Sequence, residues 1–155
     1  MTDLSSISFE VIDLEPGGPK TMHPRVNETL FAELVRSFEA SAAYDPAGGY
    51  AGIVPSYFNY GDLRDYWLGA HPDESNWSSS GSQYLLGCEC GEAGCWPLDG
   101  HIEVQGEEVV WSQFSQPHRR ERDYAGFGPF RFSLVAYTRA LDAALTALTA
   151  TENET

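Results

Sequence analysis

Alternating apolar and polar residues predict two strands near the start of the chain. Residues 7–14 place Phe9 and Val11 on one side and two further apolar residues on the other, as a strand does. A stretch rich in proline and glycine then predicts a turn. Residues 20–26 predict a short second strand, which Pro24 would place at a sheet edge because proline lacks a backbone N–H.

Apolar residues at helical spacing predict two main helices. The first runs from Asn27, as its N-cap, to about residue 43. The second starts at Ser133, where Phe132 and Tyr137 are spaced to form a hydrophobic staple across the cap. The buried stripes of the two helices are expected to be Leu30, Phe31, Leu34, Val35 and Phe38, and Leu134, Tyr137, Leu141, Leu145 and Leu148. A short helix over residues 63–68, capped by Asp62, is expected to turn Tyr66 and Trp67 inward.

Three strands joined by tight turns are predicted in the second half of the chain. They cover residues 84–90, 95–105 and 108–115, and a two-residue Gly-Glu turn sets the register of the last two. One face is the expected core, made of Leu85, Trp96, Leu98, Ile102, Val104, Val109 and Trp111. Pro97 argues against a middle strand that begins at residue 95, because proline has no backbone N–H for the sheet. A middle strand that starts only at Leu98 would shift the register of the meander. The predicted fold class is α+β, with an antiparallel sheet that contains a three-stranded meander and is packed by the two main amphipathic helices.

Composition predicts a folded acidic domain. The chain has 155 residues, of which 42% are hydrophobic and 13% aromatic, so a single domain over 1–155 is expected, with an ordered core over about 6–149 and a frayed C-terminal tail. The polar first residues do not resemble a leader, and no apolar run approaches the length of a membrane span, so we expect a cytoplasmic protein. A net charge of −14 repels nucleic acids and anionic membranes, which leaves a protein as the expected partner.

Three cysteines and one histidine are the candidate chemical site. If the predicted strands pair through their turns, Cys90, Cys95 and His118 form one row across the sheet, and Cys88 lies two residues from Cys90 on the same face. Three thiolates and an imidazole are a common tetrahedral zinc site, although Cys-x-Cys-x4-Cys is not the usual knuckle spacing. Ordinary unreactive thiols are the alternative. His101 is set aside as a ligand, because it is too far along the strand from Cys95.

The same residues also fit a cysteine-dependent enzyme, hydrolytic or redox. Cys95 or Cys88 would be the nucleophile, His118 would lower the pKa of the thiol and act as base, and Asp99 or Asp123 would orient the imidazole.

A short basic stretch interrupts the acidic chain after the third strand. Arg119, Arg120 and Arg122 could bind a phosphate or a carboxylate. The interpretation we favour is that these arginines pair with the many nearby acidic residues.

Three motifs occur in fixed order in the second half of the chain. They are GCxCGxxGCWPL over 87–98, VWxxFxQPHR over 110–119 and DYxxFGPF over 123–130. Their combined spacing resembles the signature of a family of uncharacterised bacterial proteins of similar size. The resemblance implies membership and no activity, so it assigns no role to any residue.

Together these observations predict a small cytosolic binding or interaction protein with a Cys/His cluster that holds zinc or free thiols. The two alternatives are a cysteine-dependent enzyme, and an acidic inhibitor or immunity-type protein that binds a basic partner.

Overall fold

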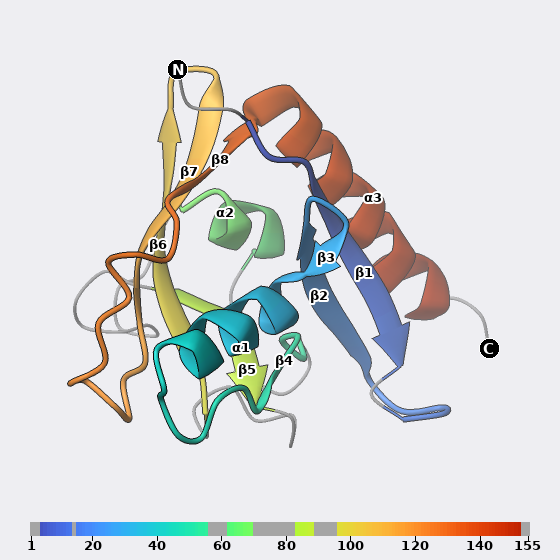
Figure 1. Cartoon of the computed structure of the whole chain (residues 1–155). Helices are drawn as coiled ribbons and strands as arrows, with labels where there is room; N and C mark the ends of the chain where they lie inside the picture. The colour runs from blue at the N-terminus through green and yellow to red at the C-terminus, as the bar shows by residue number, and fades with distance from the viewer. Residues whose placement is uncertain (1–3, 14, 56–61, 70–82, 89–95, 153–155) are drawn as a thin grey trace.

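The fold is α+β, with strands and helices mixed along the chain. The structure, a computed structural model, describes residues 4–13, 15–55, 62–69, 83–88 and 96–152. Within these ranges the chain forms a three-stranded and a five-stranded antiparallel sheet with three helices (Figure 1). The strands are β1 (Ile7–Asp13), β2 (Lys20–Val26), β3 (Thr29–Leu30), β4 (Tyr50–Ala51), β5 (Gln83–Cys88), β6 (Leu98–Gln105), β7 (Glu108–Ser115) and β8 (Phe130–Ser133). The helices are α1 (Phe31–Ser41), α2 (Leu63–Trp67) and α3 (Leu134–Glu152).

The first sheet has the order β1-β2-β3 and confirms the two strands expected from the alternating pattern. Asn27 is not the N-cap of α1, contrary to the prediction. Asn27 and Glu28 have φ angles of 51° and 71° and form the two-residue turn between β2 and β3, as type I′ hairpins do. The Asn27 side chain accepts the Ser6 N–H at 2.9 Å instead, and α1 begins only at Phe31.

Pro24 does not lie in an edge strand, because β2 is the middle strand of this sheet. The sheet accommodates the missing N–H on the side away from β1. There β3 pairs only with Arg25 and Val26, and Ile53 bridges only Met22, so both neighbours stop short of Pro24.

The second sheet has the order β4-β5-β6-β7-β8. Its β6–β7 hairpin pairs Gln105 with Glu108, which is the register that the two-residue turn predicted. Further along, Gln113 has a φ of 55° in a bulge that shifts the pairing by one residue before Asp99 meets Ser115. Strand β8 was not predicted.

The ends of α2 and α3 follow their local sequence signals. Asp62 accepts the N–H of Asp65 at 3.0 Å, as expected of an N-cap. Ser133 accepts the N–H of Ala136 at 3.3 Å, and the rings of Phe132 and Tyr137 lie 5.7 Å apart, which confirms the cap and the staple. Helix α3 continues to Glu152, past the point where fraying was expected.

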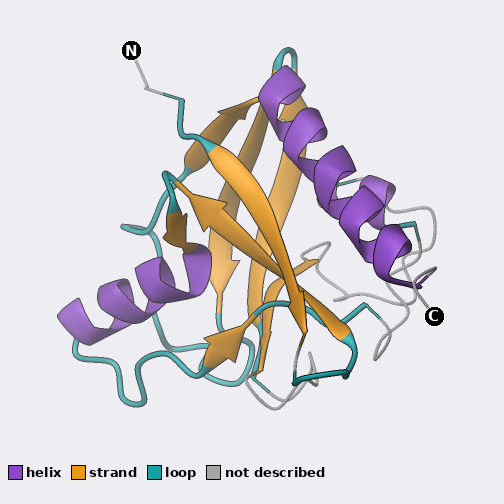
Figure 2. Ribbon diagram, turned by 90° about the vertical axis from the view of Figure 1, so that its right-hand side faces the viewer, coloured by secondary structure: helices purple, strands orange, loops and turns teal. Residues whose placement is uncertain are grey.

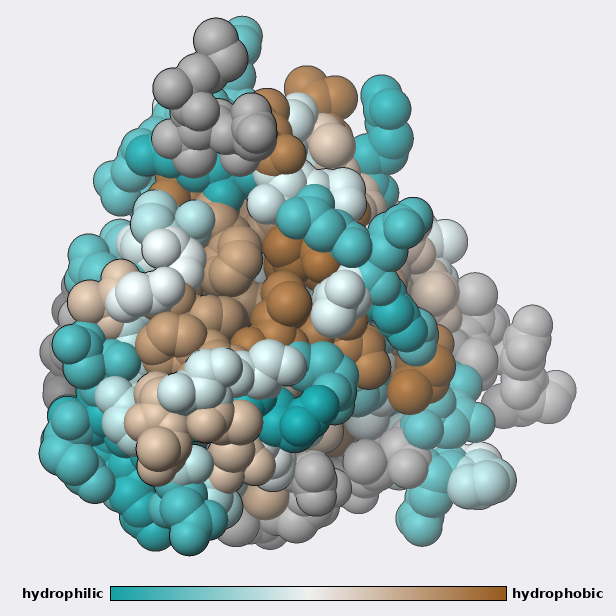
Figure 3. Space-filling view, viewed as in Figure 1, coloured by the Kyte–Doolittle hydropathy of each residue, from teal (hydrophilic) through white to brown (hydrophobic). Residues whose placement is uncertain are grey.

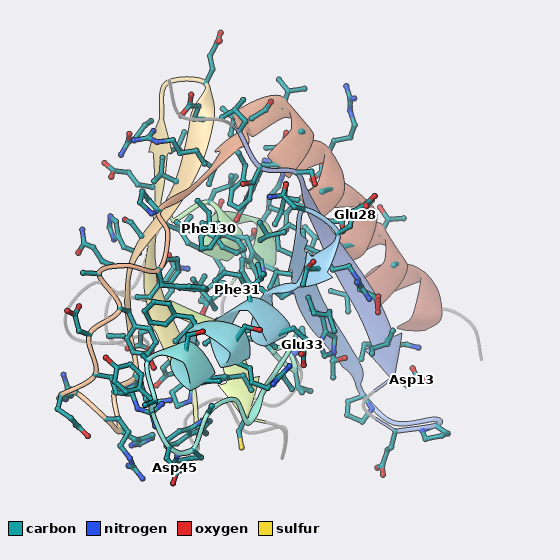
Figure 4. All side chains as sticks on the ribbon, in the orientation of Figure 1. Asp13, Glu28, Phe31, Glu33, Asp45 and Phe130 are labelled. Atoms are coloured by element: carbon teal, nitrogen blue, oxygen red, sulfur yellow. The ribbon has the colours of Figure 1, made fainter. Side chains whose placement is uncertain are left out.

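The core lies between the two sheets, and α1 and α3 lie on opposite sides of the molecule with strands between them (Figure 2). Trp67 of α2 joins the sheets, because its ring lies 5.0 Å from Phe9 in β1 and 5.9 Å from Trp111 in β7. Phe31, at the start of α1, lies 5.2 Å from Trp111 and 5.6 Å from Phe130 (Figure 4). The predicted core residues Leu85, Leu98, Ile102, Val109 and Trp111 are buried. Val104 was wrongly included, since it is 42% exposed near the tip of the β6–β7 hairpin.

Apolar residues also reach the surface on one face. Figure 3 shows them in the centre of this face, between β8 and the three-stranded sheet, inside a hydrophilic rim. None of the helices described is both long enough and apolar enough to cross a membrane.

Candidate functional site

Helix α1 buries a carboxylate near its C-terminal end. Glu39 is 0% exposed, and its Oε2 accepts the hydroxyls of Tyr50 at 2.6 Å and Tyr124 at 2.5 Å. The same oxygen lies 3.2 Å from Nη1 of Arg122, while Oε1 accepts the N–H of Gly48 at 2.8 Å. A buried charge is tolerated when it is paired and fully hydrogen-bonded, and these four donors meet that requirement. We call Glu39, Tyr50, Tyr124 and Arg122 the Glu39 hub.

The two phenols of the hub remain donors at neutral pH. Burial, followed by the hydrogen bond to Glu39, raises the pKa of Tyr124 to about 12 and the pKa of Tyr50 well above its ordinary value. The hub therefore ties α1 to two distant segments, around Tyr50 and around Tyr124. Because its donors and acceptors are already satisfied, it is a structural clamp and not an open binding site.

A group of ring contacts adjoins the hub at Tyr50. The Trp96 ring contacts Tyr50, at 6.2 Å and 25°, and His118, at 6.3 Å and 11°. Its indole N–H donates to the Gly48 carbonyl at 2.8 Å. The guanidinium of Arg119 lies 5.1 Å from the centre of the Trp96 ring, within cation–π range. We call Tyr50, Trp96 and His118 the Trp96 stack.

A buried glutamine fixes the position of the His118 backbone relative to the hub. Gln116 donates from its amide nitrogen to the Tyr50 hydroxyl at 3.0 Å, and its amide oxygen accepts the His118 N–H at 2.9 Å. The imidazole itself is on the exposed side of this turn.

The cysteines lie only partly within the described structure. Cys88 is the last residue of β5, half-buried, and lies opposite Tyr50 of β4. Cys90 and Cys95 lie outside the described residues. Among the residues that are described, no group of three histidine, cysteine, aspartate or glutamate side chains could hold a metal ion.

The strand register differs from the one on which the predicted row depends. Strand β6 starts at Leu98, and its pairing with β5 matches Tyr84 to Asp99 and Leu86 to Leu98, with an irregularity between them. The predicted register is therefore wrong within the described residues, while the row itself stays a prediction because Cys90 and Cys95 lie outside them. The Trp96 stack supplies a different connection, since it places His118 against Trp96, the residue that follows Cys95 in the chain.

Asp99, predicted as an orienting group, is buried in the sheet. It is 5% exposed, lies opposite Tyr84 on one side and Ser115 on the other, and its Oδ1 has no hydrogen-bond partner among the described residues. Burial raises the pKa of Asp99 to about 6, and the charges of Arg120 and His118 oppose this rise. Asp99 is thus a carboxyl group that changes charge near neutral pH. Asp123, the other predicted orienting group, accepts the N–H of Ala125 at 2.8 Å in an exposed turn.

The three arginines of the basic stretch have different environments. Arg122 is buried, pairs with Glu39 and donates to the Pro46 carbonyl at 2.8 Å, so its guanidinium is engaged inside the protein. Arg119 and Arg120 are exposed, and Arg119 covers the Trp96 ring.

An open groove of about 500 Å³ runs beside the hub. Its lining consists of Ser112, Gln113, Phe114, Arg122, Asp123, Tyr124, Ala125, Phe127 and Pro129. The charged groups among these residues already hold hydrogen bonds within the protein, so the groove adds no further reactive group.

Sequence reasoning missed the Glu39 hub. One signal was available, because Glu39 follows Val35 by four residues and therefore falls on the apolar face of its helix. Its partners could not have been found in this way, since Tyr50 and Tyr124 are 11 and 85 residues distant along the chain.

No protein-family model, curated protein or solved structure matches this chain. The resemblance to a bacterial family therefore stays a prediction.

Proposed function

We propose that this chain is a small binding protein in which Cys88, Cys90, Cys95 and His118 hold a thiophilic metal ion, with zinc as the expected ion. The observation that carries the proposal is the Trp96 stack. It connects four segments of the chain, because Cys88 pairs with Tyr50, Tyr50 contacts Trp96, and Trp96 contacts His118. Each of these segments contains or adjoins a candidate ligand.

Zinc suits this set of residues because three thiolates and one imidazole complete a tetrahedral shell. A closed shell has no position for a substrate, so the metal would stabilise the fold and would not act in catalysis. Two residues bonded to the hub would support such a site, since Gln116 holds the His118 backbone and the Gly48 carbonyl holds the indole of Trp96. With a net charge of −14, the protein surface favours a basic protein as the partner of this binding protein.

The test is metal analysis of protein purified without chelator. We expect about one zinc per chain, and its loss in Cys88→Ser and in His118→Gln. His101→Gln is the matched control, because His101 is a half-exposed histidine of β6 and should leave the metal content unchanged. A folded, metal-free protein whose three thiols all react with a thiol reagent at ordinary rates would refute the proposal.

A second candidate function is a cysteine-dependent reaction, and Asp99 is the observation that favours it. A buried carboxyl group whose pKa is about 6 lies in the electrostatic field of His118 and could stabilise the imidazolium that a thiolate requires. This candidate predicts a metal-free protein in which one thiol reacts with iodoacetamide much faster than the others at pH 7. It also predicts that Asp99→Asn slows that thiol.

A further inference from the structure

A short segment of the chain connects the two sheets. Tyr50 and Ala51 form β4 and pair with β5 in the five-stranded sheet. Two residues later, Ile53 exchanges both backbone hydrogen bonds with Met22 of β2, at 2.9 and 3.1 Å, in the three-stranded sheet. We call Tyr50–Ile53 the inter-sheet segment. Gly52 lies between its two attachments.

His23 of β2 bonds to the centre of this segment through one ring nitrogen, and its other ring nitrogen is held within β2. Its Nδ1 accepts the N–H of Gly52 at 3.1 Å, and its Nε2 lies 2.7 Å from the hydroxyl oxygen of Thr21. That hydroxyl donates its single proton to the carbonyl of Ile12 at 3.0 Å. The Thr21 oxygen must therefore accept from His23, so Nε2 carries the ring proton. The need of Gly52 for an acceptor at Nδ1 leads independently to the same neutral tautomer.

The backbone of Gly52 approaches β2 more closely than a residue with a side chain could. A Cβ placed on Gly52 would lie 2.3 Å from the Met22 carbonyl oxygen and 2.8 Å from Cγ of His23. Protonated Nδ1 would become a donor that faces the Gly52 donor, so the hydrogen bond between them would be lost. Separation of the segment from β2 is the way to relieve this conflict.

We propose that His23 makes the inter-sheet segment an acid-sensitive joint, which is closed while the imidazole is neutral and opens when Nδ1 is protonated. Opening would separate Gly52 and Ile53 from β2. It would also disturb Tyr50, which belongs to both the Glu39 hub and the Trp96 stack. The inference does not depend on a bound metal.

The charged groups around His23 set the pH range of the joint. Glu10 lies opposite His23 on β1 and favours the charged ring, while Arg25 on β2 disfavours it and pairs with Glu10 at 2.9 Å. The inter-sheet segment itself contains no charged side chain. Burial is the largest effect and holds the pKa of His23 below its ordinary 6.5. Since the open state takes up a proton first, the opening equilibrium constant should rise by up to about tenfold per pH unit as the pH falls below 6.5.

Two substitutions separate the roles of the two ring nitrogens. In His23→Asn, the side-chain oxygen can replace Nδ1 as the acceptor for Gly52, but it cannot titrate. In His23→Gln, the polar group extends to the position of Nε2, so the acceptor for Gly52 is lost at every pH. His101→Asn, in a half-exposed histidine of β6, is the control.

The measurement is hydrogen exchange of the Gly52 and Ile53 amides between pH 7.5 and pH 5, corrected for the intrinsic pH dependence of exchange. In the wild type and in His101→Asn, protection of both amides should fall on acidification, by up to about tenfold per pH unit. In His23→Asn, protection should stay flat, and in His23→Gln it should be low throughout. Equal pH dependence in the wild type and in His23→Asn would overturn the proposal, as would a wild-type Gly52 amide whose protection is the same at both ends of the range.

Discussion

Replacement of Asp99 by asparagine should change the free energy of unfolding more favourably at high pH than at low pH. The pKa of Asp99 rises from 3.8 to about 6 in the folded protein, so the folded state holds the proton more tightly than the unfolded chain. An ionised Asp99 therefore lowers the free energy of unfolding. This penalty is absent below pH 3.8, grows as the pH rises, and is complete above about pH 6.

The size of the effect follows from the same two pKa values. At about 1.4 kcal/mol per pH unit, the penalty is about 3 kcal/mol at pH 7.5 and about 1 kcal/mol at pH 4.5. Asparagine preserves the shape of the side chain and removes the charge. Its unpaired amide carries a cost of its own, but that cost is independent of pH. The difference between the two pH values, about 2 kcal/mol, is therefore the quantity to compare.

The assay is urea unfolding of the wild type and Asp99→Asn at the two pH values and constant ionic strength. Asp142→Asn is the control, because Asp142 is an exposed aspartate of α3 whose ion pair with Arg64 lies at the surface. If Asp99→Asn changes the free energy of unfolding by the same amount at pH 7.5 and pH 4.5, the carboxyl group ionises normally in the folded protein and the reasoning is refuted.

Two further predictions concern other buried or capping carboxylates. Glu39→Gln should lower the free energy of unfolding by about 3–5 kcal/mol, because it leaves the Arg122 guanidinium buried without a counter-charge. Glu33→Gln, on the exposed side of the same helix, should cost less than about 1 kcal/mol, and similar losses in the two variants would contradict the role of the hub. Asp62→Ala should cost about 1 kcal/mol through loss of the α2 cap, whereas Asp62→Asn, which can still cap, should be nearly neutral in chemical denaturation.

Local signals predicted those features whose partners are close in the sequence. The Gly-Glu turn predicted the register of β6 and β7, since a two-residue loop leaves one way to pair the strands beside it. The Ser133 cap and the staple between Phe132 and Tyr137 were also read correctly, because all their atoms lie within one turn of the start of α3.

The failures occurred where a distant segment changed the local outcome. Asn27 suits a helix cap by its chemistry, but the pairing of Val26 with Thr29 uses it in a hairpin turn. Strand β8 exists because β7 offers it an edge, which the periodicity of its four residues cannot reveal. The predicted register between β5 and β6, and between β6 and β7 next to Asp99, was wrong because it extended an ideal pairing through two irregularities that the sheet contains.

The sequence by itself determined the class of the fold, most of the strands, the position and apolar face of α3, and the acidic character of the chain. These properties depend on periodicity, turn residues and composition, which act over a few residues or as sums over all of them. The tertiary structure alone decided that Glu39 is buried among Tyr50, Tyr124 and Arg122, that His118 stacks on Trp96, and that His23 holds Gly52. Each of these contacts joins groups from separate segments, and a hydrogen bond or ring contact depends on positions in space that only the packed sheets establish.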